Sequence, residues 1–532
     1  MTFSPRPVYL SESFMLPVGK YNGRQRPEMS FFGLVDALQP LLEETSCDKN
    51  KIDCVVVGCQ NPFAFSGIDN VAAKISGRLG ISGAKSLLVD TASSSGASAF
   101  EAAYLEVASG QHDHVLAIGI QKMSDVTTAE ATRIVAGVID REEAEYGLTM
   151  PACGALVAQS LMQEFQLSKA EWTEYSARLT ERAQHFAAQN SDAHLNYEIP
   201  VKKYYEDIKT GKNYLYYDPL YYYDFCPMSD GIGACLLTAD PGDVRVAGVG
   251  SGTDIPTIAD RLTFTSFPAT TIALNQVLGM AGLKNLNALE GSIHINMHDP
   301  FNGFGPINLA DLGVVSRENL LGALLDDSCT GPNGRFPTNL TGGLKGRGHP
   351  LGATGMIQIV ENHQLLKKGR FTAALSHSIG GPINNNVVVL LENEDHFKKR
   401  KPTPYRATAR PLLGKLKPAH INLEAILGKD HKCSAKLVAK TSKHNYRTGE
   451  EEKSLLLFSK KFEGERYRFL IGVDPKSAAP LRELNPGDKI QLQKHNTELR
   501  VNDVPIRRFY RKTIEGMVEM ADTAFRHLRR KK

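Results

Sequence analysis

A serine-rich turn near residue 90 could position a nucleophile. Residues 90–96 read DTASSSG, follow a short apolar run, and lead into small residues that predict a helix to about Ser109. A side chain at the start of a helix meets free backbone N–H groups and the positive end of the helix dipole. Such a position can stabilise an attacking anion or an oxyanion. Serines are also common helix caps, so this segment alone favours a plain N-cap over a nucleophile.

Two later segments carry histidines that could do chemistry. His298 lies in the sequence NMHDPF of residues 296–301, directly after a predicted strand. His349 lies in the glycine-rich sequence GGLKGRGHPLGATG of residues 342–355. Glycine permits positive φ and close backbone approach. A lone histidine is usually structural, but this setting is poorly suited to a core and favours a working role for His349.

The segments that must position these groups alternate between strands and helices. Short apolar runs predict strands at residues 53–58, 86–90, 115–119, 292–296, 372–375 and 387–392. Helices are expected over residues 95–109 and after Gly352. This order favours an α/β fold with buried sheets, and its repetition indicates two related halves.

Composition excludes several classes of protein. The chain has 532 residues, 42% hydrophobic and 23% charged, which is typical of a globular protein of several domain-sized units. No apolar run reaches the roughly 18 residues of a spanning helix, and the first seven residues lack the pattern of a secretory signal. Eight cysteines without a CxxC pair argue against a disulfide framework or a zinc ribbon. We therefore expect a cytoplasmic protein without a metal site.

The charges divide the chain into two parts. Residues 398–532 hold 33 Lys and Arg against 15 Asp and Glu, a net charge of +18, and the remainder carries −14. The boundary coincides with a charged segment containing two prolines, which predicts a linker over residues 397–404. Such asymmetry is typical of a separate module that meets a polyanion.

Taken together, these motifs resemble the thiolase superfamily, specifically the sterol-carrier-protein-type (SCP2-type) thiolases. Residues 343–355 are similar to the GHPxGATG signature, and residues 298–301 resemble the HDCF motif. Three further segments match the family in order, and they are residues 119–125, 146–152 and 226–231. The resemblance covers roughly residues 5–395. It implies a first thiolase half over residues 1–245, with a loop or cap region at about 125–230, and a second half over residues 246–396.

The resemblance also assigns roles to individual residues. In the family a cysteine at a helix N-terminus attacks an acyl-CoA, so acyl-CoA is the implied ligand, and no permanently bound cofactor is expected. Ser93 takes the position of that nucleophile, His349 that of its activating base, and His298 that of an oxyanion donor. Pro300 stands where the HDCF cysteine shuttles protons. The late loop corresponds to Ser378-Ile379-Gly380, with the Gly380 N–H as the implied second oxyanion donor.

Both reactive cysteines of the family are therefore missing. A thiolate is accessible near neutral pH at a helix N-terminus, whereas a serine hydroxyl needs a base within about 3 Å. Ordinary thiolase turnover is not expected, and we expect an acyl-CoA-binding protein of the acyltransferase superfamily. One alternative is a serine acyltransferase or thioester hydrolase that uses Ser93 and His349. Another is a non-catalytic scaffold, or a nucleic-acid-binding protein acting through the basic module.

The basic region, residues 405–532, lies outside the resemblance. Strand-like runs at residues 434–439, 454–458, 467–473 and 489–492 predict a small β-barrel, perhaps OB-like, with a helix over residues 512–530. Its surface could bind nucleic acid, extend the landing area for CoA phosphates, or dock on the acidic body, and docking or a solvated face is favoured.

Two further expectations concern packing and assembly. Eight tyrosines between residues 204 and 223 could form an aromatic wall for a ligand, but an excursion packed by its own rings is the favoured interpretation. The family resemblance implies a homodimer with the strand before Ser93 near the interface, and the extra module could block that contact.

Overall fold

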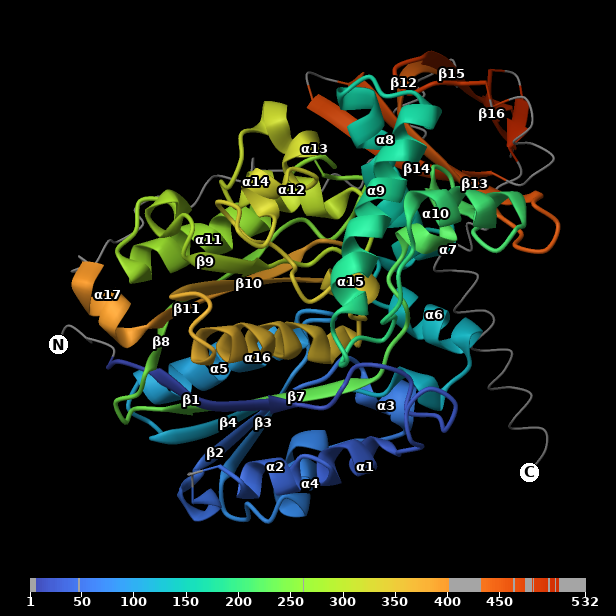
Figure 1. Cartoon of the computed structure of the whole chain (residues 1–532). Helices are drawn as coiled ribbons and strands as arrows, with labels where there is room; N and C mark the ends of the chain where they lie inside the picture. Colours follow the sequence, from blue (N-terminus) through green and yellow to red (C-terminus); the bar gives the residue numbers. More distant parts are fainter. Residues whose placement is uncertain are drawn as a thin grey trace, which may run out of the picture.

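The computed structural model describes residues 6–45, 48–261, 263–400, 432–462, 465–473, 481, 483–495, 498–502 and 504–506. A layered α/β body precedes a separate antiparallel sheet that contains the described strands after residue 431 (Figure 1). The predicted α/β thiolase-type fold followed by a β-rich module is confirmed.

One nine-stranded mixed sheet organises the body. Its strands are β1 (Tyr9–Met15), β2 (Cys54–Gly58), β3 (Lys85–Val89), β4 (His114–Gln121), β7 (Gly231–Thr238), β8 (Val244–Thr253), β9 (Ile293–Asn296), β10 (Ala373–Gly380) and β11 (Asn385–Asn393). Their order is β3-β2-β4-β7-β1-β8-β11-β10-β9. β2 is parallel to β3 and β4, and β9 is parallel to β10. β1 and β8 join the two halves through the pair Tyr9–Arg245.

Helices cover both faces of each half of this sheet. The α-helices of the body are α1 (Phe31–Asp36), α2 (Gln39–Glu43), α3 (Pro62–Ser66), α4 (Val71–Arg78), α5 (Ser95–Ala108), α6 (Thr128–Ala136), α7 (Arg141–Glu145), α8 (Met150–Glu164), α9 (Lys169–Ala188), α10 (Val201–Lys209), α11 (Pro268–Ala281), α12 (Phe304–Asp311), α13 (Leu320–Ala323), α14 (Asp327–Thr330), α15 (Gly343–Gly346), α16 (Thr354–Lys367) and α17 (Glu394–Arg400). Short 3-10 turns are η1 (Lys49–Lys51), η2 (Met123–Asp125), η3 (Tyr222–Asp224), η4 (Leu286–Leu289), η5 (Arg317–Asn319) and η6 (Leu351–Ala353).

The central layer consists of α5 and α16, which lie between the two halves of the sheet (Figure 1). Phe100 of α5 and Met356 of α16 share a buried cluster with residues from strands of both halves. The outer layers are α1 and α4 on the first half and α11 and α12 on the second. Strand β2 is buried at every residue, because both of its faces are covered, and this explains its continuous apolar sequence.

The strands predicted in the body are confirmed, with shifts of one or two residues at most ends. β10 is the exception, because it extends five residues beyond the predicted end, to Gly380. Ser378 therefore belongs to the strand. The helix predicted over residues 95–109 is α5, and the helix predicted after Gly352 is α16.

The C-terminal sheet is antiparallel throughout. Its strands are β12 (Lys432–His444), β13 (Glu451–Phe462), β14 (Glu465–Val473), β15 (Lys489–His495), β16 (Glu498–Val501) and β17 (Val504–Ile506), in the order β14-β13-β12-β15-β16-β17. These strands include the four predicted runs. The expected helix over residues 512–530 lies outside the described residues, and the OB-like topology stays a prediction.

The C-terminal sheet packs directly on the body. β5 (Leu215–Tyr217) and β6 (Leu220–Tyr221) extend it, since Tyr217 pairs with Lys443 of β12. Ala439, Leu455 and Leu457 share an apolar cluster with Leu156 of α8. Burying each leucine contributes about 2 kcal/mol, so docking rests on apolar packing rather than on the charge difference alone.

The structure refines the predicted linker and the tyrosine-rich excursion. Residues 397–400, assigned above to a linker, form the end of α17, because Arg400 makes a bidentate ion pair with the buried Glu392. The tyrosine-rich excursion packs on itself, since Tyr204 is buried, contacts three neighbouring tyrosine rings and donates to Asp224. Among the described helices, none is both long and apolar enough to cross a bilayer.

The buried Glu143 carboxyl gives the body a pH dependence. Burial raises its pKa from 4.5 to about 7, although the backbone N–H groups of Ile258 and Ala259 donate to it at 2.9 and 2.7 Å. The native state holds a proton that the unfolded chain releases above about pH 4.5. This contribution to stability is present below that pH and is lost as the pH rises through about 7.

The free energy of unfolding of the wild type should fall between about pH 5 and pH 8. We predict that this fall is about 2 kcal/mol smaller in Glu143→Gln, because glutamine carries no proton to release. Urea unfolding at both pH values measures it. Glu142→Gln, at the exposed neighbouring position, is the matched control. An unchanged pH dependence in Glu143→Gln would refute the assignment.

Candidate active site

Ser93 lies at the start of α5 and is not the residue that caps the helix. The Ser94 hydroxyl donates to the Thr91 carbonyl at 2.8 Å, and the Ser95 hydroxyl donates to the Ala92 carbonyl at 2.5 Å. The turn is tight, because Ala92 has a φ of 58°. Within the described part of the chain, the half-buried Ser93 hydroxyl makes no hydrogen bond. Its neighbours therefore close the turn, and Ser93 stays available to a ligand.

The end of β10 lies against this turn. A Cβ on Gly380 would overlap the Thr91 carbonyl oxygen and the Ser94 hydroxyl, so only glycine fits. Ser378, two residues earlier, is buried and has a hydroxyl without a hydrogen-bond partner among the described residues. The structure thus brings Ser378 and Gly380 to the segment that carries Ser93.

The start of α16 completes this junction. A Cβ on Gly355 would lie 2.7 Å from the Ala97 backbone nitrogen and 2.9 Å from the Ser378 hydroxyl. A Cβ on Gly96 would lie 2.7 Å from the Gly352 carbonyl oxygen. Glycines at these positions let α5, β10 and the segment after His349 touch backbone to backbone.

His298 and His349 form a pair. Their ring centres are 5.0 Å apart and the rings are nearly perpendicular. The His349 Nδ1 atom shares a 2.8 Å hydrogen bond with the Thr354 hydroxyl, and its backbone N–H donates to Ser229. The His298 Nδ1 atom is buried without a hydrogen-bond partner in the described structure. The two histidines lie together although 51 residues separate them in sequence.

Burial keeps both imidazoles neutral. Desolvation, followed by the positive charge of Arg347, lowers the pKa of His349 to about 3. Desolvation and the neighbouring His349 lower the pKa of His298 well below its usual value. Arg347 is itself held by a 2.8 Å ion pair with the buried Glu361. A neutral imidazole can accept a proton or share a hydrogen bond with a carbonyl group.

Asp299 joins the loops that carry the two histidines. Its Oδ1 atom accepts a 2.7 Å hydrogen bond from the Leu344 N–H. Gly343 has a φ of 58°, and a Cβ there would lie 2.6 Å from Asp299 Oδ2. Burial raises the pKa of Asp299 to about 6. The loop after β9 is thereby fixed against the glycine-rich loop.

A second buried network was missed by the sequence analysis. Asn302 donates to Asp224 at 2.8 Å and accepts a short hydrogen bond from the Lys345 ammonium group. Burial lowers the pKa of Lys345 to about 8 and raises that of Asp224. The only sequence signal was a lysine inside a glycine-rich loop. This network ties the tyrosine-rich excursion to both histidine loops.

One cysteine lies near the histidine loops. Cys226 lies against the loop after β9, because its backbone N–H donates to the Pro300 carbonyl at 2.9 Å. Burial raises the pKa of its thiol to about 12, so the thiolate is disfavoured.

One side-chain group has the composition of a metal site. The ligand atoms of Cys54, Glu106 and His112 lie within 4.8 Å of one another. Glu106 already pairs with Lys85 and His112, and burial raises the pKa of Cys54 to about 12. These partners fit an ordinary ion-pair cluster better than a metal centre.

Family models and known proteins match the body of the chain. A model of the thiolase N-terminal domain matches residues 8–240, and a thiolase C-terminal domain-like model matches residues 250–393. An acetyl-CoA acetyltransferase of Methanothermobacter thermautotrophicus is 31% identical over 358 residues, which cover 64% of this chain and 88% of that protein. Sterol carrier protein 2 of Bos taurus is 25% identical over 338 residues, covering 59% and 60%.

A solved structure extends the likeness beyond the body. A monomeric SCP2-thiolase-like protein type 1 from Mycobacterium smegmatis superposes with a TM-score of 0.69 at 17% identity. It covers 94% of this chain and 99% of its own, so the shared fold includes more than the matched thiolase domains.

We predict that Gly343→Ala destabilises the body by about 2 kcal/mol, because the new methyl group would meet Asp299 at a positive φ. Thermal and urea unfolding measure this. Gly77→Ala is the control, since nothing lies within 4 Å of its added Cβ in the helix α4. Equal stability of the two variants would refute a tight Asp299 contact.

Proposed function

The chain belongs to the thiolase superfamily as an SCP2-type member, and we propose that it binds CoA thioesters without ordinary thiolase turnover. The observation that carries this proposal is the pair of residues at the family's cysteine positions, Ser93 and Pro300. Pro300 lies two residues after His298, which pairs with the neutral His349, and the turn that carries Ser93 contacts Gly380. The framework suits a thioester carbonyl, whereas the groups that would break and form bonds differ.

The serine limits the first chemical step. A cysteine at the start of α5 would lose its proton readily, because the helix N-terminus stabilises a thiolate. The Ser93 hydroxyl gains nothing comparable, and a base must remove its proton during attack. His349 is neutral, so it is the candidate base that would accept the Ser93 proton when substrate is bound.

The proline limits the second step. Carbon–carbon bond formation between acyl groups requires a proton to leave the carbon next to a carbonyl. Pro300 carries no group that exchanges protons, and the neighbouring Cys226 thiol stays protonated because burial raises its pKa to about 12. The proposed activity therefore stops at binding and orientation of the thioester.

The remaining groups favour holding the acyl carbonyl. His298 and His349 offer neutral imidazoles, and the Gly380 N–H belongs to the strand end that touches the Ser93 turn. Preorganised donors of this kind stabilise an oxyanion, and in a binding protein they hold a polarised carbonyl. CoA is a ligand or substrate in this proposal and not a resident cofactor.

We predict that purified protein binds acetyl-CoA, lacks measurable thiolysis, and becomes acylated when Ser93 is replaced by cysteine. Intact-protein mass after incubation with acetyl-CoA should reveal an acetyl adduct on Ser93→Cys at a rate about tenfold or more above the control. Ser109→Cys is the matched control, because it places an exposed thiol just beyond the other end of α5. Robust thiolysis by the wild type, or no binding and no adduct, would overturn the proposal.

A serine-based acyltransferase or hydrolase is the second candidate. It is favoured by one observation: among the described residues, the Ser93 hydroxyl has no hydrogen-bond partner. The neutral His349 is the base that this candidate requires. The same mass measurement separates the candidates. An acyl adduct on the wild type that disappears in Ser93→Ala supports catalysis, and an adduct that persists in Ser93→Ala refutes Ser93 as the nucleophile.

A nucleic-acid role for the C-terminal module has less support. Residues 432–462 hold eight Lys and Arg against three Glu, which would attract a polyanion. Phe458 lies fully buried inside the sheet, so it offers no stacking surface.

A cytoplasmic location is likewise proposed, supported by seven free thiols among the described residues.

We also propose a homodimer through β3. This strand ends the sheet, and Leu88 on it is 42% exposed, with Phe63 of α3 61% exposed. Among the described residues, the C-terminal sheet lies away from β3 (Figure 1). Exposed edge strands with apolar side chains are suited to pairing with a second chain.

We predict a dimer mass in sedimentation velocity and a monomer for Leu88→Lys. Met280→Lys, which alters a similarly exposed residue of α11, should leave the dimer intact. A monomeric wild type across concentrations would refute the dimer.

A further inference from the structure

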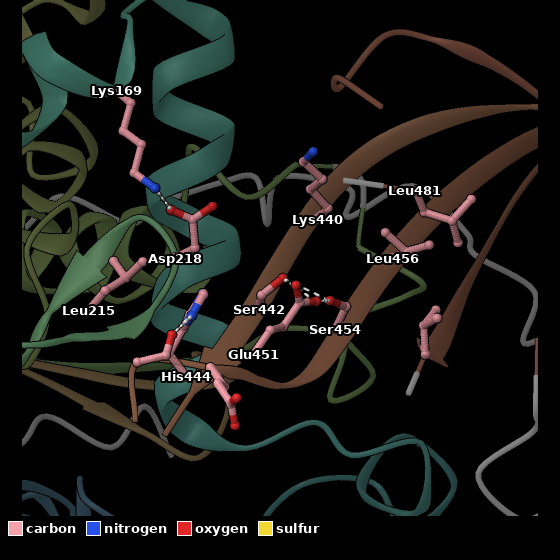
Figure 2. Close-up of a pocket in the computed structure, with 13 residues that line it drawn as sticks. Lys169, Leu215, Asp218, Lys440, Ser442, His444, Glu451, Ser454, Leu456 and Leu481 are labelled. Atoms are coloured by element: carbon pink, nitrogen blue, oxygen red, sulfur yellow. Dashed lines mark hydrogen bonds and ion pairs between the residues drawn. The ribbon is translucent and has the colours of Figure 1, made fainter. Parts of the chain in front are cut away.

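A cavity separate from the serine and histidine site lies beside the C-terminal sheet. It has a volume of about 790 Å³ and lies between the β12–β13 hairpin and the body residues Lys169, Leu215 and Asp218 (Figure 2). This volume falls in the range of small-molecule sites, roughly 300–1,000 Å³. None of the residues assigned to the thiolase site lines it.

A β-bulge creates this chamber. The register between β12 and β13 shifts between Leu437, which opposes Phe458, and Ala439, which opposes Leu457. Before the bulge, the odd-numbered residues of β12 fill the interior of the sheet, and after it they face the body. After the bulge, the even-numbered residues Lys440, Ser442 and His444 therefore face the chamber, beyond the end of the apolar core of the sheet.

The floor of the chamber is apolar and continues the core of the C-terminal sheet. Leu456, Val473 and Leu481 belong both to that core and to the cavity lining. Leu215 adds an apolar wall from the body. These four branched side chains suit a compact hydrocarbon surface.

Two serine hydroxyls from neighbouring strands line the chamber. The Ser442 and Ser454 hydroxyls lie 2.8 Å apart, and both contact Glu451 (Figure 2). The Glu451 carboxylate accepts a hydrogen bond from each hydroxyl, so the serine oxygens can accept a hydrogen bond from an incoming hydroxyl or amide N–H. The pair is held by backbone on both strands, since Ser442 opposes Ser454 in the ladder.

The charged groups of the lining offset one another. Lys169 forms a 2.7 Å ion pair with Asp218 on the body side of the lining, and Lys440 carries the opposite charge to Glu451. Glu450 lies exposed at the rim, and His444 shares a hydrogen bond with the Gly449 carbonyl. A charged ligand would lose hydration without meeting a dominant opposite charge.

We propose that this chamber is a second ligand site, which binds an uncharged amphipathic molecule. Its apolar body lies on Leu456, Val473 and Leu481, and its hydroxyl or amide group meets the Ser442–Ser454 pair. The site uses residues of the C-terminal sheet and of the body together. It gives the C-terminal module a role independent of CoA thioester binding.

Fluorescence titration of the full chain with N-phenyl-1-naphthylamine, an uncharged apolar probe, tests the site. The probe should bind and be displaced by 1-decanol at least about tenfold better than by decanoate or decylammonium, which share its chain length. Displacement by either ion as strong as by the alcohol would overturn the ligand class. Absence of probe binding to the wild type would overturn the site.

Two tryptophan substitutions locate the bound probe. Ser442→Trp fills the chamber and should weaken probe binding at least about tenfold. Ser434→Trp changes the same residue type on the same strand, at an exposed position before the bulge, and should leave binding within about twofold. If thermal unfolding shows that Ser442→Trp is not folded, Leu215→Trp replaces it as the blocking variant, because it fills the chamber from the body side. Equal binding by the blocked and control variants would refute the location.

Discussion

The contact between Asp299 and the glycine-rich loop holds the site together. Two segments separated by 44 residues of sequence meet there, and each carries one histidine. The carboxylate can reach the Leu344 N–H only because Gly343 has no side chain and a positive φ. Three residues after Asp299, Asn302 accepts a hydrogen bond from Lys345 and donates one to Asp224. The short segment from Asp299 to Asn302 therefore contacts both the glycine-rich loop and the end of the tyrosine-rich excursion. The perpendicular histidine pair is a consequence of that arrangement.

The two replacements at the cysteine positions leave this framework undisturbed. Serine is nearly the same size as cysteine, and the hydrogen bonds of the turn come from Ser94 and Ser95 rather than from Ser93. Proline lacks a backbone N–H, yet the Pro300 carbonyl still accepts a hydrogen bond from Cys226. Chemistry and architecture are therefore separable in this chain. Under the proposed function, the absence of both sulfur groups would remove proton and acyl transfer steps and leave the surface that would hold a thioester.

The sequence was sufficient for the body because local patterns and long-range structure agree there. Buried strands such as β2 are apolar at every position, and the helix α5 begins directly after a serine-rich turn. Family motifs select Ser93, His298, His349, Ser378 and Gly380 as site residues, and this assignment stays a prediction. The sequence could not tell which of the neighbouring serines close the turn before α5. The Lys345 network escaped because its partners lie in three segments and no periodicity links them. The chamber escaped for a similar reason, since a single bulge near Val438 reverses the side-chain pattern of β12.

The position of the C-terminal sheet gives it a mechanical connection to the site. Ala439 and Leu457 of the sheet belong to the same apolar cluster as α8 and Phe301. A Cβ on Gly154 of α8 would lie 2.7 Å from the Phe301 ring, so helix and ring are in direct contact. Phe301 follows Pro300 in the loop that Asp299 anchors. The apolar layer on α8 therefore continues from the C-terminal sheet to the loop that carries His298, and packing of the sheet on α8 supports that loop.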